Sequence, residues 1–239
     1  MASDDGSALP AAWTPQGLAL LDHHHGRRPA VVVVHTGGGE SEDVDASDFF
    51  RGEEQLDPWE QLALERCGAR VLDLGAGAGQ HTLALQARGR RVTALDSCPE
   101  CVQVMQLRGV EDAREGELAS LASDHAFDTV LLLMHGAGVA GDLDGLRALL
   151  VAAGRVLGPA GELLVDSRDP GEACADGEVD GVAVAELQME YRGRRGRPFP
   201  WLFLSAQALA ALADDRGWRT HVLHRDADGR YLACLSRSA

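Results

Sequence analysis

The chain has no lysine, no isoleucine and no asparagine, so all 22 basic residues among its 239 are arginine. Without lysine, neither a Schiff-base nucleophile nor the lysine of a phosphate-binding P-loop is available. The codons of the three missing residues are AT-rich. Their joint absence therefore indicates a GC-rich genome, and the lack of lysine says little about mechanism.

Positive charge and long apolar runs are also scarce. The 22 basic residues stand against 37 acidic ones, which gives a formal net charge of −15. A surface this acidic repels nucleic-acid backbones and anionic lipid headgroups, so we expect neither nucleic acid nor a membrane as a partner. The longest apolar runs, at residues 31–34 and 130–134, are far too short to span a bilayer. Together with the acidic N-terminus, they favour a cytoplasmic protein.

Cysteine is too scattered for a disulfide framework. The five cysteines form an odd, irregular set. They are Cys67, Cys98, Cys101, Cys174 and Cys234. Cys98 and Cys101 have the spacing of a redox or metal pair, but no second pair completes a metal site. The adjacent histidines at 23–25 cannot all converge on one ion. We therefore expect no bound metal.

From residue 69 onward, short apolar runs of strand type alternate with segments of helical period. This alternation is typical of βαβ units and a parallel sheet. Residues 220–224 and 231–235 flank the turn sequence at 226–229, which favours an antiparallel hairpin. The sequence thus predicts an α/β fold with a mostly parallel sheet that ends in an antiparallel hairpin.

The N-terminal part has a different character. Residues 1–16 are small, polar and interrupted by proline, and we expect a flexible tail. Residues 17–56 contain a short helical segment, an apolar run at 30–35 and a glycine-rich acidic loop. We expect this segment to form a helical and loop lid over the ligand site of a main domain at residues 57–239, because such lids keep water from a reacting centre.

Three glycines follow the strand expected at residues 70–74. Gly75, Gly77 and Gly79 let a strand turn tightly into a helix, whose free N–H groups then point at a ligand. Asp96 lies 21 residues past Gly75, at the end of the next strand, where a carboxylate suits a ribose diol. These residues predict a ligand that carries a nucleoside.

Two details separate the candidate ligands. A dinucleotide fingerprint needs a third glycine at position 80, which is Gln80 here. Asp73 lies inside the strand, where a pyrophosphate binder wants an apolar residue and where an unpaired carboxylate is costly to bury. Both details disfavour a nicotinamide dinucleotide, and Asp73 favours a cationic ligand.

The segment from Val71 to Gly79, taken with Asp96, resembles the cofactor signature of the Rossmann-like, class I S-adenosylmethionine-dependent methyltransferases. Residues 127–138 and 157–166 resemble the fourth and fifth strands of that fold. The resemblance implies a doubly wound, mostly parallel seven-stranded sheet, with residues 57–239 as the methyltransferase domain. It also implies S-adenosylmethionine as the cofactor and S-adenosylhomocysteine as the product.

The resemblance further implies a set of cofactor contacts. The residues are Asp73, Gly75, Ala76, Gly77 and Gly79 for the methionine moiety, Asp96 for the ribose, and Ser97, Glu117 and Leu118 for the adenine. Met134 and His135 follow the fourth strand, which opens toward the sulfonium. From its place at the end of the lid segment, Arg51 is expected near the methionine carboxylate.

Methyl transfer needs mainly alignment, with a base where the acceptor must lose a proton. His135 is the first candidate because it follows an apolar strand at its carboxyl end, and His81, at the start of the helix after the glycines, is the second. Arginines at 192–197 and aromatic residues at 191–203 are expected mainly at the surface and in sheet packing, with acceptor contact as the alternative.

The implied function is methyl transfer to a small-molecule or peptide acceptor, in specialised metabolism of a bacterium, by a monomer or a homodimer. No base-flipping motif of the Asn/Asp-Pro-Pro-aromatic type follows the fourth strand, which disfavours methylation of DNA. Two alternatives stay open. One is an inactive methyltransferase-like binding or scaffolding subunit, and the other is the disfavoured NAD-dependent oxidoreductase.

Overall fold

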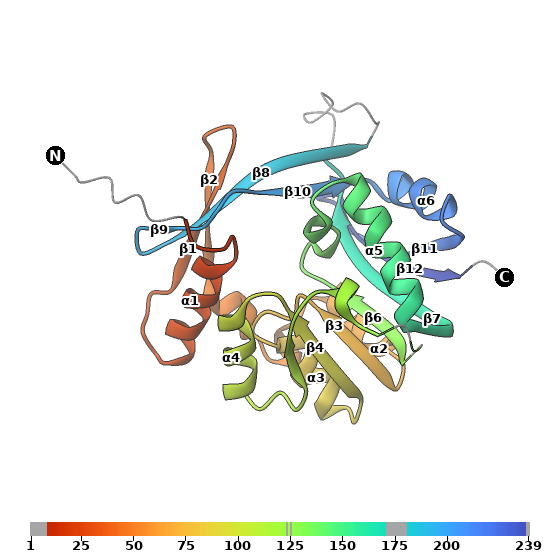
Figure 1. Ribbon diagram of the computed structural model, residues 1–239, viewed down its shortest axis with the longest axis horizontal. Coiled ribbons are helices and arrows are strands. Elements are labelled where there is room, and N and C mark those ends of the chain that lie inside the picture. The colour runs from red at the N-terminus through yellow and green to blue at the C-terminus, as the bar shows by residue number, and fades with distance from the viewer. Residues whose placement is uncertain (1–8, 123, 125, 171–180, 238–239) are drawn as a thin grey trace.

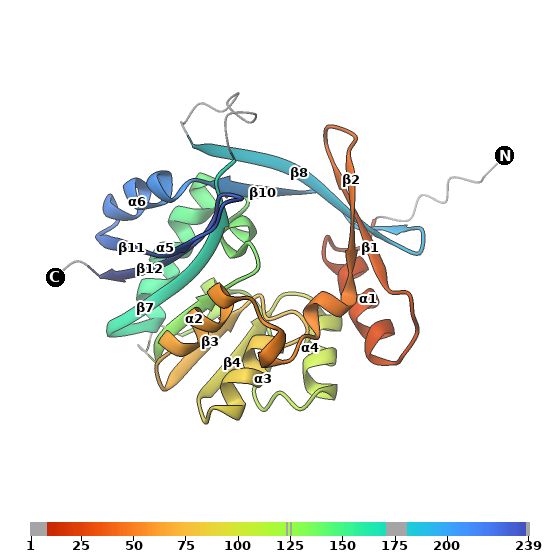
Figure 2. The same cartoon turned by 180° about the vertical axis from the view of Figure 1, so that it is seen from behind.

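A computed structural model describes residues 9–122, 124, 126–170 and 181–237, and contains two β-sheets (Figures 1 and 2). The larger sheet has seven strands in the order β11-β12-β7-β6-β3-β4-β5. Its strands are β3 (Arg70–Leu74), β4 (Arg91–Asp96), β5 (Ala113–Glu115), β6 (Phe127–Leu132), β7 (Leu157–Arg168), β11 (Trp218–Arg225) and β12 (Arg230–Arg237). The strands β3 to β7 pair parallel with one another, whereas β12 pairs antiparallel with both β7 and β11. The predicted fold class is confirmed.

Helices cover both faces of this sheet, because apolar residues along its buried strands point to alternate sides. Leu72 packs with the helices of one face and its neighbour Val71 with those of the other. The helices are α5 (Leu143–Val156) and α6 (Ala206–Asp214) on the first face, and α2 (Pro58–Arg66) and α3 (Gln80–Ala87) on the second. α4 (Pro99–Leu107) follows β4 and packs on the residue Ala94 of that strand. The sheet is therefore doubly wound.

The second sheet joins two distant parts of the chain. Its order is β10-β8-β1-β2, with β9 paired to β8. The strands are β1 (Val31–Thr36), β2 (Ser41–Asp45), β8 (Val182–Tyr191), β9 (Arg194–Arg195) and β10 (Phe199–Leu204). In both views, β8 and β10 run above the parallel strands, from the side of α1 (Thr14–His24) to the side of α6 (Figures 1 and 2).

The lid segment differs from its expected form. α1 begins at Thr14, inside the stretch expected to be tail, and the predicted loop after Thr36 contains the strand β2. The physical reason is pairing: β1 lies between β2 and β8, so both edges of its valine run have hydrogen-bonded neighbours. Two short 3-10 helices, η1 (Ala46–Phe49) and η2 (Glu53–Gln55), lead from β2 to α2. This segment therefore contains strands as well as the expected helix and loop, and its role as a lid stays a prediction.

One face of the second sheet packs beside the glycine loop. Val32 of β1 and Met189 of β8 belong to the same buried cluster as Leu20 of α1, Val104 of α4 and Ala78 of the glycine loop. α1 and the second sheet are thus fixed against the main sheet at the edge where its parallel strands end. The division at residues 56 and 57 stays a prediction, and strands from both sides of it share this second sheet.

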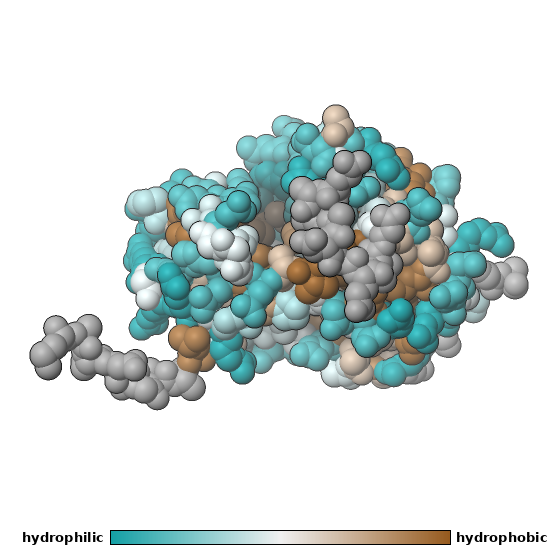
Figure 3. Space-filling model, turned by 90° about the horizontal axis from the view of Figure 1, so that it is seen from above, coloured by the Kyte–Doolittle hydropathy of each residue, from teal (hydrophilic) through white to brown (hydrophobic). Residues whose placement is uncertain are grey.

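Two further observations concern the described part of the chain. None of its helices is long and apolar enough to cross a membrane. Its surface, seen from above the second sheet, is mostly hydrophilic, with small apolar patches (Figure 3). Cys174 lies outside the described residues.

Candidate functional site

The parallel strands β3, β4, β5 and β6 end at one edge of the main sheet. The glycine loop, residues 75–79, leaves β3 at this edge and is fastened to β4 by the N–H of Gly75, which donates to the carbonyl of Leu95 at 2.8 Å. Gly75 has a φ of 70°, and a Cβ built there meets no atom within 4 Å. The loop therefore has the left-handed backbone that favours glycine and open space on that side.

Asp96 binds the glycine loop from the end of β4. Its carboxylate accepts the N–H of Gly77 at 2.9 Å and the N–H of Cys98 at 2.8 Å. Burial raises the pKa of Asp96, while these two amide donors act to lower it. Each carboxylate oxygen has further acceptor capacity, so Asp96 is able to accept additional hydrogen bonds from a ligand's hydroxyls.

Asp73 is buried in β3, as the sequence indicated. The hydroxyl of Thr82 donates to Asp73 Oδ2 at 2.6 Å, and burial raises the pKa of the carboxyl. Among the described residues, Asp73 forms no ion pair within 4.0 Å. A buried acid without an ion-pair partner fits a site that receives a cationic ligand.

The first turn of α3 connects the site to three other elements. Gln80 donates to Sδ of Met134, after β6, at 3.3 Å, whereas Thr82 reaches Asp73. Between them, His81 Nε2 lies 2.7 Å from Oε1 of the wholly buried Glu60, in α2. Successive helical residues point in different directions, so one turn holds α2, β3 and the end of β6 together.

Arg51 joins Glu60 and His81 in a charged chain. Its guanidinium donates to Glu60 Oε1 at 2.8 Å and to Asp57 Oδ2 at 3.3 Å. Burial acts to raise the pKa of Glu60, but the His81 hydrogen bond and Arg51 outweigh it and the pKa is lowered. The structure thus brings His81 and Arg51 together through Glu60, a residue that the sequence did not single out, although its place three residues after the helix cap Asp57 marks a capping box.

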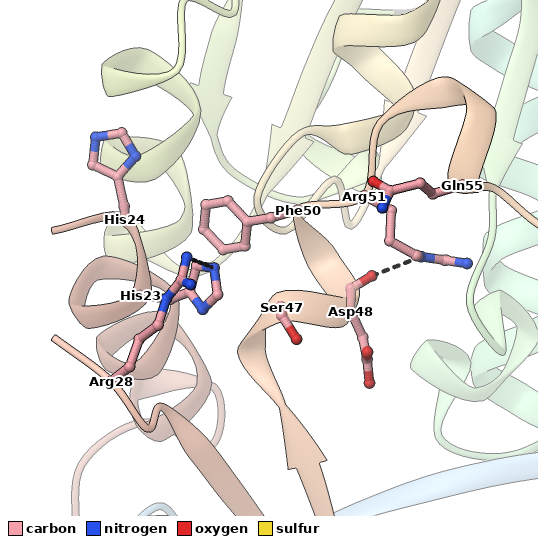
Figure 4. Close-up of a pocket in the computed structure, with 8 residues that line it drawn as sticks. All are labelled: His23, His24, Arg28, Ser47, Asp48, Phe50, Arg51 and Gln55. Carbon is pink, nitrogen blue, oxygen red and sulfur yellow. Dashed lines mark hydrogen bonds between the residues drawn. The ribbon is translucent and has the colours of Figure 1, made fainter. Parts of the chain in front are cut away.

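Arg51 also lines a cavity of about 470 Å³ on the lid segment (Figure 4). The lining residues are His23, His24, Arg28, Ser47, Asp48, Phe50, Arg51 and Gln55. In Figure 4, the Arg51 side chain extends beside η1, where its Nε donates to the carbonyl of Asp48 at 3.0 Å. Its expected contact with a methionine carboxylate stays a prediction.

The residues expected around the adenine lie at the same sheet edge. Ser97 follows β4 directly and is exposed. Glu117 is exposed and Leu118 is buried, just beyond β5, whose Glu115 pairs with Asp96. These three residues therefore follow the ends of two neighbouring strands, β4 and β5.

Met134 and His135 form an unusual turn after β6. Both have positive φ, at 65° and 61°. His135 Nε2 lies 2.7 Å from an Nη of Arg230, in β12, and a guanidinium has no acceptor, so Nε2 accepts and the ring hydrogen is on Nδ1. Burial, helped by the charge of Arg230, lowers the pKa of His135 to about 4. The imidazole is therefore neutral near neutral pH.

Sequence reasoning missed Asp166, at the end of β7. Its carboxylate is wholly buried and accepts the backbone N–H groups of His135 and Gly136, each at 2.9 Å. Arg230 lies 3.8 Å away. The signal that marked Asp73, an acid after an apolar strand run, is present here also in Leu163-Leu-Val-Asp166.

The aromatic residues, arginines and cysteines that the sequence singled out pack in the fold or pair with other residues of the chain. The rings of Phe199 and Trp201 pack around Trp13, with centroids 4.9 and 5.8 Å from it. Arg195 pairs with Glu190 at 2.7 Å. Cys98 and Cys101 are buried free thiols at the start of α4. In the described part of the chain, no three His, Cys, Asp or Glu residues are grouped as a metal would require.

Known proteins resemble the chain over the same region. A family described as "Methyltransferase domain" matches residues 72–165. A cypemycin N-terminal methyltransferase from a Streptomyces species is 32% identical over 108 residues, and a ubiquinone biosynthesis O-methyltransferase from Xanthomonas oryzae pv. oryzae is 33% identical over 114 residues. These alignments span 44% and 45% of the two curated relatives, and 44% of this chain in each case.

A solved structure of higher sequence identity matches nearly the whole chain. It is a SAM-dependent methyltransferase from Bacteroides fragilis, described in complex with S-adenosyl-L-homocysteine. The two chains are 34% identical, the match covers 99% of this chain and 100% of that one, and the TM-score is 0.88. With this identity over the full length, the chain belongs to the S-adenosylmethionine-dependent methyltransferases.

Proposed function

We propose that the protein transfers the methyl group of S-adenosylmethionine to a small-molecule or peptide acceptor. The observation that carries the proposal is the sheet edge where Asp73, Asp96 and the glycine loop meet, in a chain 34% identical over its length to a methyltransferase described with S-adenosyl-L-homocysteine. The names of the curated relatives include an N-terminal methyltransferase and an O-methyltransferase, and support either kind of acceptor.

The residues present fit this cofactor. Open space beside Gly75 gives room at the loop, and the buried Asp73 supplies negative charge for a sulfonium and an ammonium group. Asp96, held by two amides, suits the ribose hydroxyls, with Ser97, Glu117 and Leu118 beside the adenine. Ala76, Gly77, Gly79, Met134, His135 and Arg51 complete the proposed set of cofactor contacts.

The bound cofactor supplies an electrophilic methyl group on a sulfonium. The contribution of the chain is mainly to align the acceptor and exclude water. His135 is neutral at pH 7, but its Nε2 lone pair accepts a hydrogen bond from Arg230, so a proton could move to Nε2 only after that contact breaks. His81 likewise has Nε2 engaged, by Glu60. We therefore propose that His135 positions reactants, and that the acceptor is already nucleophilic at neutral pH.

Calorimetry with S-adenosylmethionine, S-adenosylhomocysteine and NAD tests the cofactor. We expect heat with the first two and none with NAD. Asp96→Ala removes a charged acceptor, which typically costs about 1.5 to 3 kcal/mol, so binding should weaken by roughly ten-fold or more. Asp144→Ala, at an exposed carboxylate on α5, is the control and should bind as wild type. Binding of NAD alone would refute the assignment.

The acceptor is found by turnover. The protein is incubated with methyl-labelled S-adenosylmethionine and panels of small molecules and short peptides, and labelled products are identified by mass. Cofactor binding without label transfer to any panel member would favour the scaffolding alternative. The expected cytoplasmic location, specialised-metabolism role and monomeric or dimeric state stay predictions.

A further inference from the structure

The turn after β6 has a backbone that needs support. Met134 and His135 are consecutive residues with side chains, and both have a left-handed φ, at 65° and 61°. This conformation is unfavourable for L-residues and persists where surrounding contacts hold it. The next residue, Gly136, is also closely packed, since a Cβ there would lie 2.7 Å from Cγ of Leu132.

Asp166 supplies that support from the neighbouring strand. Oδ2 accepts the N–H of His135 and Oδ1 accepts the N–H of Gly136, each at 2.9 Å. Two successive amides thus converge on one carboxylate, in the manner of a backbone nest around an anion. The Asp166 side chain is wholly buried, so water does not compete for these amides.

The side chains of the turn lead into the site. Met134 Sδ accepts from Gln80, the first residue of α3 after the glycine loop. His135 Nε2 accepts from Arg230, which also lies 3.8 Å from Asp166. Because Asp166 fixes the backbone between these two side chains, it determines where both lie relative to the glycine loop.

We propose that Asp166 is a positioning residue for methyl transfer, and that it holds the turn at Met134, His135 and Gly136 only as a carboxylate. The proposal rests on the proposed function, in which Met134 and His135 contact the cofactor. Asp166 acts through the two amides, so its loss should weaken cofactor binding by disordering the turn.

The charge state matters because a protonated carboxyl carries an O–H, which would oppose one of the two N–H donors. Burial raises the pKa of Asp166 to about 6, although the two amides, Arg230 and His81 act to lower it. The titratable or charged side chains that interact with it are Arg230 and Tyr231 from β12 and His81 from α3, whereas His135 contacts it through its backbone N–H. The turn should therefore loosen as pH falls through about 6.

The first experiment uses the wild-type protein. Amide resonances of His135 and Gly136 are followed by ¹⁵N NMR from pH 8 to pH 5, and S-adenosylhomocysteine binding is measured by calorimetry at both limits. We expect both amides to titrate with a midpoint near pH 6 and the affinity to be about ten-fold lower at pH 5, as the loss of charge-assisted hydrogen bonds implies.

The second experiment uses Asp166→Asn, which keeps the volume but replaces one acceptor oxygen with a donor. The variant should bind S-adenosylhomocysteine about ten-fold more weakly at pH 8, and its amide midpoint near pH 6 should disappear. Asp128→Asn is the matched control. Asp128 accepts the N–H of Arg70 at 3.0 Å at the other end of β6, and its loss should leave affinity and midpoint unchanged.

The outcomes of the two experiments test the role of Asp166 separately from the proposed function. Wild-type affinity in Asp166→Asn, or a Gly136 amide that does not titrate between pH 5 and 8, overturns the proposal. If Asp166→Asn does not fold, the wild-type titration still decides. If the wild type binds no S-adenosylhomocysteine at any pH while the amides titrate, Asp166 holds the turn as proposed and the proposed function fails.

Discussion

Arg230 donates a hydrogen bond of 2.7 Å to Nε2 of His135, and this contact sets the tautomer of the imidazole. A guanidinium only donates, so the ring is neutral and its hydrogen is on Nδ1. Nδ1 is buried and, within the described residues, has no hydrogen-bond partner. The sequence suggested this histidine as a base, but its basic nitrogen, Nε2, already accepts a hydrogen bond from Arg230.

His135→Asn tests whether this histidine is a base. Asn tolerates the left-handed φ of the turn better than most residues. We expect turnover at pH 7 to fall by less than about ten-fold, because a positioning residue loses less than the 10²- to 10⁴-fold typical of a general base. The wild-type rate should show no titration step that His135→Asn lacks, since the pKa of His135 is lowered to about 4. A step near pH 6 from Asp166 should be present in both proteins.

The measurement is kcat against pH for both proteins, with cofactor binding checked by calorimetry. A loss of 10²-fold or more in His135→Asn, with a titration step near pH 6.5 in the wild-type rate that the variant lacks, would show that His135 does accept a proton during turnover.

Arg230→Met tests the cause of the lowered pKa. Methionine keeps an apolar side chain of similar reach but removes the charge that, after burial, lowers the pKa of His135 most. The pKa should rise above about 4 while staying below 6.5, because burial remains. Histidine NMR shifts against pH measure it. Arg147→Met, at a surface ion pair on α5, should leave the His135 pKa where it is; an identical pKa in Arg230→Met would rule out the contact as a cause.

His135 also couples stability to pH. Its pKa is lowered on folding from 6.5 to about 4, so the unfolded chain binds the proton more readily. The stabilisation is complete above pH 6.5 and is lost as pH falls toward 4. At pH 5 the wild type should lose up to about 2 kcal/mol more than His135→Asn, relative to pH 8.

Chemical unfolding of both proteins at pH 8 and pH 5 gives this difference. Asp166 acts in the opposite sense, because its pKa is raised to about 6 and folding then favours its protonated form. Since Asp166 is present in both proteins, its contribution cancels in the comparison, provided that the replacement leaves its two amide contacts intact. Equal losses in the two proteins would contradict a lowered His135 pKa.

The periodicity of apolar residues predicted the main sheet well. The features that it missed depend on pairing between strands. β3 has the predicted limits and α3 begins directly after the glycines as predicted, because apolar residues and the glycines mark them locally. β2 has the sequence Ser-Glu-Asp-Val-Asp, which carries no strand pattern and is a strand because β1 needs a partner. The relation between Asp166 and His135 was equally invisible, since it depends on β6 and β7 being neighbours.

Truncation of the N-terminal segment is a poor test of whether residues 17–56 form a lid over the cofactor. Removing residues 1–48 would also remove β1, which pairs with β8, and would expose the buried face of the second sheet. Loss of cofactor binding in that truncation would then report unfolding as well as a missing lid. A single substitution that moves α1 while the second sheet stays intact is therefore preferable.

Gly17→Ala is that substitution. A Cβ at Gly17 would lie 2.6 Å from Sγ of Cys98 and 2.6 Å from Cβ of Glu100, so α1 must move away from α4. Such overpacking costs about 1 to 3 kcal/mol, which lowers Tm by roughly 2 to 10 °C for a chain of this size.

The movement of α1 in Gly17→Ala should also weaken cofactor binding. His23 of α1 stacks on Phe50 at 4.5 Å, and the neighbouring Phe49 lies 3.9 Å from the position of a Cβ on Gly77. Displacing α1 therefore disturbs the cover of the glycine loop, and S-adenosylhomocysteine affinity measured by calorimetry should fall several-fold. Gly37→Ala is the control, because its Cβ would meet Glu186 at an ordinary 3.6 Å. A lower Tm in Gly17→Ala with wild-type affinity would mean that α1 stabilises the fold without covering the cofactor.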